Sequence, residues 1–145
     1  MTTNIATTRE QSARLLQCGV DPDTADMSWV RGAANVSDGN LSLHPYRRMQ
    51  RINWQSMRGR SEIAPAWSLS TLLGLLPKEI CDENDDSFYF SLAKEFPLSE
   101  EYGAAYIPCW DEGDALVRKC DNDPIEACVQ LIEWLTANNY KLNQL

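Results

Sequence analysis

The sequence predicts an α+β fold, with helices and an irregular segment first and a β-β-β-α arrangement after them. Before residue 78, helical segments with capping residues flank a weakly periodic stretch. After residue 78, apolar residues alternate with polar ones, as in strands. After Asp123, apolar residues recur at helical spacing. A chain of 145 residues has the size of one domain. We therefore expect a single domain over 1–145, with a helical and irregular part at 1–77 and a β-β-β-α part at 78–145.

A short helix is predicted near the N-terminus. Either Thr7 or Thr8 begins it, because a capping-box partner stands three residues further on in both cases. Gly19 ends it, since glycine adopts the left-handed conformation of a helix C-terminus without steric cost. A turn over 21–26 follows, because proline and short acidic side chains favour turns.

Residues 27–66 form the least periodic part of the chain. Glycines and prolines interrupt short apolar pieces such as 27–30 and 41–43. An irregular stretch of this length is unusual inside a compact domain. We interpret it as a functional loop, as a segment that a partner orders, or as regular structure that the sequence pattern does not assign.

Three strands are predicted in the C-terminal half. Residues 88–93 alternate between apolar and polar or small side chains, and the segments 102–110 and 115–120 are rich in strand-forming residues. Their turn-like connections make a three-stranded antiparallel meander the simplest topology, and a short piece around Ile80 is a candidate for a preceding strand. Pro108 lacks an amide hydrogen, so we expect its strand at an edge or at a bulge.

Two more helices follow from capping and periodicity. Ser68 or Ser70 begins a leucine-rich core helix that Pro77 ends. Asp123 begins an amphipathic C-terminal helix, and Glu126 is placed to complete its capping box. The apolar face of this helix must pack on a partner, for which the adjacent sheet is the nearest candidate. That face consists of Ile125, Cys128, Val129, Leu131, Ile132, Trp134 and Leu135.

Charge is distributed unevenly along the chain, whose net charge is −8. Residues 1–60 carry 8 basic and 5 acidic side chains, whereas residues 61–145 carry 5 basic and 16 acidic ones. Such a chain binds nucleic acid only through a segregated basic face, and 44–60 is the one candidate. Its five arginines stand beside aromatic residues without any acidic one, which suits phosphate or base contacts and equally an acidic protein surface. The candidate partner or nucleic-acid surface is Arg47, Arg48, Arg51, Trp54, Arg58 and Arg60.

The sequence lacks the patterns of the common metal and catalytic sites. Five cysteines at irregular spacing include no C-x-x-C pair, so we expect reduced, mostly buried thiols and no metal. His44 is the only imidazole and is interpreted as a loop histidine. The acidic run 82–86 is interpreted as a solvated turn, because it lacks the glycine and glutamate of a calcium loop. Asp111, Glu112 and Asp114 are compatible with a hard cation, and an acidic hairpin turn explains them equally without an ion. There is no phosphate-binding glycine loop or dinucleotide motif, so we expect no cofactor and no enzyme activity.

The chain also lacks the patterns of membrane and secreted proteins. Its longest apolar stretch, 72–76, is far shorter than the roughly 20 residues that span a bilayer. The polar segment 1–11 has none of the features of a secretory signal. We therefore expect a cytoplasmic protein without membrane contact.

Several segments together resemble a known group of proteins. The chain is similar to small uncharacterised proteins of prophages and mobile elements in gut anaerobic bacteria. This resemblance covers most of the chain and implies a shared fold, since its residues are mainly caps, turns and helix faces. The segments that carry it are 8–16, 19–27, 65–73, 124–127 and 134–135.

The C-terminal half resembles a second family in its topology. A strand meander followed by Asn122-Asp123-Pro124-Ile125-Glu126-Ala127, which opens an amphipathic helix, is similar to HicB-type antitoxins. Those proteins bind a basic toxin through a small acidic domain. A likeness of fold does not by itself transfer function.

Three functional hypotheses follow. The first is a non-catalytic, phage-encoded or mobile-element-encoded module that binds or regulates another protein. The second is a nucleic-acid-associated factor that uses the arginines of 47–60. The third is a small enzyme whose carboxylate, cysteine or histidine geometry the sequence does not reveal.

Overall fold

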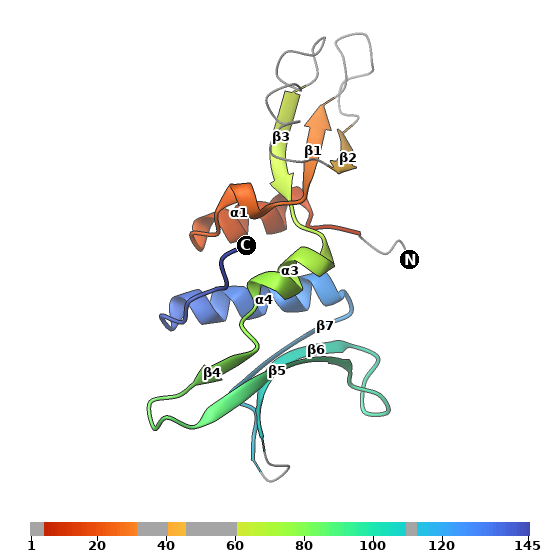
Figure 1. Cartoon of the computed structure of the whole chain (residues 1–145). Helices are drawn as coiled ribbons and strands as arrows, with labels where there is room; N and C mark the ends of the chain where they lie inside the picture. The colour runs from red at the N-terminus through yellow and green to blue at the C-terminus, as the bar shows by residue number, and fades with distance from the viewer. Residues whose placement is uncertain (1–4, 32–40, 46–60, 110–112) are drawn as a thin grey trace.

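The computed structural model describes residues 5–31, 41–45, 61–109 and 113–145. This part of the chain forms a mixed α/β fold with three α-helices and two antiparallel sheets. The helices lie in a layer that has the four-stranded sheet on one side, while the three-stranded sheet projects from the other (Figure 1). The elements are α1 (Arg9–Gln17), β1 (Met27–Arg31), β2 (Leu41–Pro45), β3 (Ser61–Ala66), α3 (Leu69–Leu75), β4 (Glu79–Cys81), β5 (Ser87–Lys94), β6 (Tyr102–Pro108), β7 (Val117–Asp121) and α4 (Pro124–Ala137).

Helix α1 begins and ends where the sequence indicates. Thr8 Oγ1 accepts from the Gln11 amide at 3.2 Å and Gln11 Oε1 accepts from the Thr8 amide at 2.9 Å, which is a complete capping box. Gly19 follows the helix with φ of +90°. The amides of Gly19 and Val20 donate to carbonyls of the last turn at 3.0 and 3.1 Å, which closes the helix in a Schellman motif. The predicted turn is a 3₁₀ helix at Pro22–Thr24.

The described residues of the middle segment 27–66 form strands, so the expectation of irregular structure is wrong for them. Strands β1, β2 and β3 form an antiparallel sheet in the order β2-β1-β3. Trp29 pairs with Leu43 on one side and with Ala64 on the other. The backbone of His44 pairs with Ser28, so His44 is in a strand rather than a loop. These strands are too short and too often interrupted to show a period in the sequence, and pairing between distant segments defines them.

The sheet has four strands rather than the three of the predicted meander, and the additional strand, β4, lies at the candidate position around Ile80. The order of the second sheet is β4-β5-β6-β7, in which β4 pairs with β5 through Ile80 and Phe88. Pro108 is the last residue of β6, which is a central strand, so the prediction of an edge strand is wrong for β6 as a whole. Pairing of β6 with β7 ends at Tyr106, however, and a missing amide hydrogen is tolerated beyond that point because β6 is locally an edge.

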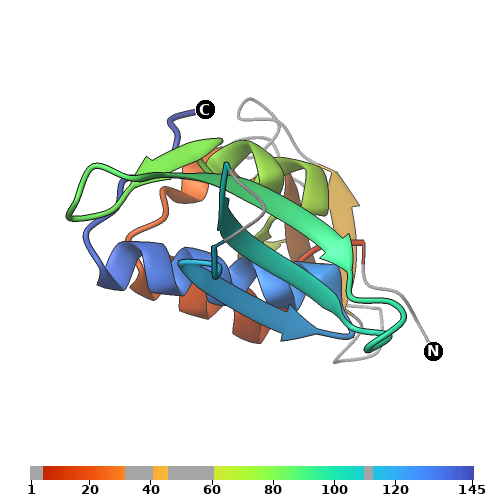
Figure 2. The ribbon, with the colours of Figure 1, turned by 90° about the horizontal axis from the view of Figure 1, so that it is seen from below.

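Helix α4 covers one face of the four-stranded sheet, and no other described element covers the opposite, outer face (Figure 2). Asp123 Oδ1 accepts from the Ile125 amide at 2.9 Å and begins the helix as predicted. The predicted return of Glu126 to this cap is wrong. The Asp123 amide instead donates to Asp121 Oδ1 at 2.9 Å, and the Glu126 carboxylate binds the Arg14 guanidinium at 2.7 and 3.0 Å.

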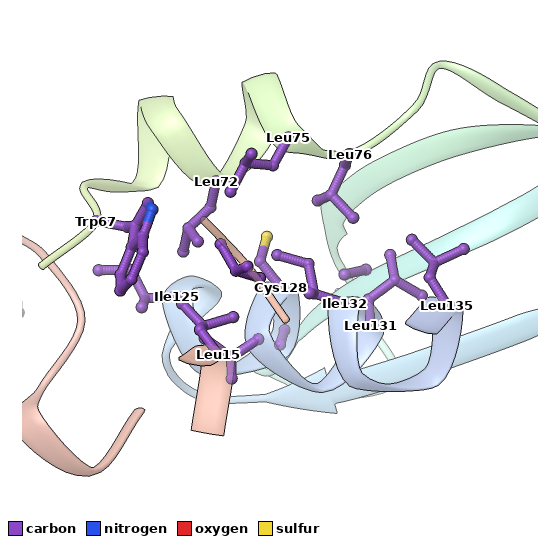
Figure 3. Close-up of a cluster of buried hydrophobic side chains, with 14 of the residues drawn as sticks. Leu15, Trp67, Leu72, Leu75, Leu76, Ile125, Cys128, Leu131, Ile132 and Leu135 are labelled. Atoms are coloured by element: carbon purple, nitrogen blue, oxygen red, sulfur yellow. The ribbon is translucent and has the colours of Figure 1, made fainter. Parts of the chain in front are cut away.

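One apolar cluster joins both parts of the chain. Trp67 and Leu72 lie across from α4 and are fully buried (Figure 3). Leu15 from α1 and Ile132 from α4 belong to the same cluster, as does Tyr106 from the sheet. Burying a side chain of this size stabilises the fold by roughly 1.5–3 kcal/mol. The helices of the N-terminal half therefore share their core with the C-terminal sheet.

The described helices are short. Helices α1, α3 and α4 have 9, 7 and 14 residues. In the described part of the chain, none of them has the length and apolar character needed to cross a membrane.

Candidate functional site

The loop between β5 and β6 presents two large apolar side chains to solvent. Phe96 is 78% exposed and Leu98 is 93% exposed, the two highest values among the described large apolar residues. They stand on either side of Pro97, in a loop at 95–101 that we name the anchor loop. Single exposed apolar residues are common on proteins, whereas neighbouring ones on a protruding loop are typical of a contact surface.

Hydrogen bonds give the anchor loop a defined conformation. The Glu95 amide donates to the Glu101 carbonyl at 2.9 Å, which closes the base of the loop. The Ser99 amide donates to the Glu95 carbonyl at 3.0 Å, and Ser99 Oγ accepts from the Glu101 amide at 3.1 Å. Phe96 and Leu98 are therefore held on a closed loop, which lowers the entropy lost when a partner contacts them.

Acidic residues precede and follow these two apolar residues in the loop. Glu95, Glu100 and Glu101 all belong to the anchor loop. Glu95 forms an ion pair with Arg118 of β7 on the outer face of the sheet. Glu100 and Glu101 have no ion pair with any described residue, so the rim of the anchor loop is negative.

The other end of the outer face is also acidic. A cavity of about 520 Å³ lies between the β4–β5 turn and the end of β6. Tyr89 lines it beside Cys109, and the charge of Glu79 raises the pKa of Tyr89, with smaller effects from the thiols Cys109 and Cys81. The acidic residues of its lining are Asp85, Asp86 and Asp114. Both ends of the outer face therefore attract basic groups.

The sequence-predicted site residues lie outside the described residues. This applies to Arg47, Arg48, Arg51, Trp54, Arg58 and Arg60 alike. The sequence reasoning missed Phe96 and Leu98, because it interpreted 97–101 only as a turn. The sequence does contain a signal for this exposed pair, because Phe96 and Leu98 stand on either side of a proline inside an otherwise acidic turn.

The acidic turn between β4 and β5 matches its interpretation. Asp82 Oδ1 accepts from the amides of Asn84 and Asp86 at 2.9 Å each, so this side chain shapes the turn. Among the described residues there is no group of three or more side chains arranged to hold a metal ion.

The cysteines contradict the expectation of mostly buried thiols. Only Cys128 is buried, while Cys81, Cys109 and Cys120 are exposed and Cys18 is intermediate. Burial raises the pKa of the Cys128 thiol to about 12. Cys81 and Cys120 belong to β4 and β7, where strand alternation directs them away from the core, and Cys109 directly follows β6.

The fold and this site define a small mixed α/β protein with an open sheet face, acidic residues at both ends of that face and an apolar loop at one of them. Comparison of the chain with protein-family models, curated proteins and solved structures gives no match.

Proposed function

We propose that this protein is a non-catalytic interaction module that binds another protein through the anchor loop. The observation that carries the proposal is the exposure of Phe96 and Leu98 on a loop closed by hydrogen bonds. Aromatic and aliphatic anchors of this kind supply most of the binding energy in protein interfaces. The proposal includes no catalytic step, because the feature behind it is a contact surface.

The free energy expected from burying the two side chains is large enough for a specific contact. Burying Phe96 and Leu98 in a partner contributes roughly 1.5–3 kcal/mol for each side chain. Their combined removal is therefore expected to weaken binding by about 100-fold or more. Glu100 and Glu101 at the rim favour a partner whose apolar pocket is surrounded by lysine or arginine.

The biological setting of the proposal comes from the sequence. The resemblance to small prophage and mobile-element proteins supports a phage-encoded or mobile-element-encoded regulator that acts in the cytoplasm. The acidic C-terminal half, with 16 acidic and 5 basic residues over 61–145, supports a basic protein partner.

A second candidate function is association with nucleic acid. It is favoured by the five arginines of 47–60, a stretch without acidic residues. Contacts of this kind displace counter-ions from phosphate, so binding is expected to weaken steeply as salt rises.

A capture experiment separates the two functions. The tagged protein is incubated with a lysate of the native host, with and without nuclease, beside a Phe96→Ser/Leu98→Ser variant and an Ile5→Ser control. Ile5 is 67% exposed and lies far from the anchor loop in the sequence, so it matches the loss of an exposed apolar side chain. We expect a nuclease-resistant protein partner that the Ile5→Ser control retains and the double variant loses.

Two other outcomes contradict the proposal. Equal capture by the double variant and the natural protein would show that the anchor loop is not the contact. Capture that disappears with nuclease would instead favour the nucleic-acid function, and arginine-to-alanine changes at 47–60 would then locate it.

A further inference from the structure

A second hollow lies at the end of the four-stranded sheet opposite the anchor loop. The hollow is lined by residues of the turn between β4 and β5 and of the C-terminal end of α4. Figures 1 and 2 show that these two segments lie side by side. Its volume is about 350 Å³. We name it the aromatic cleft, and the residues that matter for its chemistry are Asp82, Glu83, Trp134 and Tyr140.

Two stacked rings form the aromatic part of the cleft. The ring centroids of Trp134 and Tyr140 lie 5.6 Å apart with an interplanar angle of 16°. Both side chains are half-buried and pack against the core, which fixes their positions. Neither the Trp134 indole N–H nor the Tyr140 hydroxyl has a hydrogen-bond partner among the described residues. The two rings therefore make part of the cleft wall aromatic, and the Tyr140 hydroxyl oxygen is free to accept a hydrogen bond.

The lining of the cleft also includes two carboxylates, Asp82 and Glu83, and no basic side chain. Asp82 is oriented by the amides of Asn84 and Asp86, which occupy its Oδ1 atom. Glu83 is exposed and makes no ion pair with a described residue. No lysine or arginine is among the residues that line the cleft. Aromatic rings and carboxylates without ion pairs in one cleft are the chemistry that recognises an organic cation.

We propose that the aromatic cleft binds the guanidinium group of an arginine side chain presented by a partner polypeptide. A guanidinium is planar and weakly hydrated, so it stacks on an aromatic ring while its N–H groups donate to a carboxylate. A lysine ammonium is a compact, strongly hydrated charge and uses the flat surface less well. This site is separate from the anchor loop, so its test is independent of the function proposed above.

The test follows the indole N–H signal of Trp134 by nuclear magnetic resonance in the ¹⁵N-labelled full chain. A Trp134→Phe variant assigns that signal by its disappearance. The probes are N-acetyl-arginine amide and its neutral isostere N-acetyl-citrulline amide, titrated into the millimolar range. We expect a saturable shift with the arginine probe and little with citrulline. The indole of Trp67, which is buried and donates to Thr24 Oγ1 at 3.0 Å, is the unperturbed reference.

Two variants connect the shift to the proposed carboxylate. Glu83→Gln removes the charge of an exposed side chain that forms no hydrogen bond or ion pair with a described residue, so the fold is kept. Binding is expected to weaken by about threefold. Glu10→Gln changes an exposed carboxylate of α1 and is expected to leave binding unaltered. Equal shifts with arginine and citrulline, or no effect of Glu83→Gln, would overturn the proposal.

Further probes decide the identity of the cation. N-acetyl-lysine amide that binds as tightly as the arginine probe would refute the preference for guanidinium. Spermidine that binds more tightly than the arginine probe would refute a polypeptide side chain as the ligand and would indicate a free polyamine.

Discussion

Thr7 and Trp67 are joined by two hydrogen bonds of opposite direction: the Thr7 amide donates to the Trp67 carbonyl at 2.9 Å, and the Trp67 amide donates to Thr7 Oγ1 at 3.0 Å. Thr7 Oγ1 also lies 2.8 Å from Ser12 Oγ, and the Thr7 carbonyl accepts the Trp29 indole N–H at 2.9 Å. Thr7 is fully buried. This one residue therefore connects the N-terminal segment, α1, β1 and the chain that leads into α3.

Substitution of Thr7 is expected to destabilise the fold. In a Thr7→Val variant the Trp67 amide and the Ser12 hydroxyl lose a buried partner, which costs roughly 1–3 kcal/mol for each unsatisfied group. Urea unfolding should show a free energy of unfolding lower by about 2 kcal/mol or more. Thr7→Ser keeps the hydroxyl and should cost clearly less. Equal losses in the two variants would refute this role of the hydroxyl.

The contact between Arg14 and Glu126 is expected to make stability depend on pH. Burial alone raises the pKa of the Glu126 carboxyl, but hydrogen bonds from Arg14, Gln11 and Gln130 outweigh burial and leave the pKa below its usual value. A carboxyl whose pKa is lowered on folding stabilises the protein above its unfolded pKa of about 4.3, and this contribution is lost as the pH falls through the folded pKa.

A Glu126→Gln variant measures this contribution. At pH 7 we expect its free energy of unfolding to be lower by about 1–2 kcal/mol, because the carboxylate accepts charge-assisted hydrogen bonds. The difference should shrink below about pH 4, where the natural protein also loses the charge. Urea unfolding of both proteins between pH 3 and 7 is the measurement, and a difference that stays constant would contradict the mechanism.

The anchor loop is expected to be dispensable for folding. Phe96 and Leu98 are so exposed that Phe96→Ser/Leu98→Ser should change the free energy of unfolding by no more than about 0.5 kcal/mol. The double variant should also bind less of an apolar fluorescent dye in the folded state. A loss of several kcal/mol would show that the two side chains support the fold, and the capture experiment would then need the single variants.

The cysteines are expected to react in two groups. Cys81, Cys109 and Cys120 are exposed and should be alkylated in the folded protein, whereas Cys128 should react only after unfolding. Burial raises the pKa of the Cys128 thiol to about 12, so little thiolate forms at pH 8. Alkylation followed by peptide mass spectrometry checks this order. Early modification of Cys128 would indicate local opening of α4.

Local signals in the sequence predicted the helices well. Thr8, Gly19, Ser68 and Asp123 each cap a helix end through contacts with residues only a few positions away. Ser68 also donates to the Asp26 carboxylate, and this distant contact is not visible in the local sequence. The alternation at 88–93 likewise reveals a strand that has one face on the core.

The candidate site was much harder to predict from the sequence. The exposure of Phe96 and Leu98 depends on how the β5–β6 loop leaves the sheet, and a turn composition is compatible with buried or exposed apolar residues. The aromatic cleft brings Glu83 together with Trp134 and Tyr140, which lie about 50 residues further along the chain. A local sequence pattern cannot predict a contact between such distant residues.

The sequence by itself determined the caps, the apolar face of α4 and the acidic character of the C-terminal half, because these depend on neighbouring residues and on composition. Only the tertiary structure decided that β1, β2 and β3 pair into a sheet, that β4 extends the meander, and that Glu126 binds Arg14 instead of its own cap. The physical reason is that strand pairing and ion pairing between α1 and α4 join residues far apart in the chain. Their formation depends on the fold bringing both partners together rather than on either segment alone.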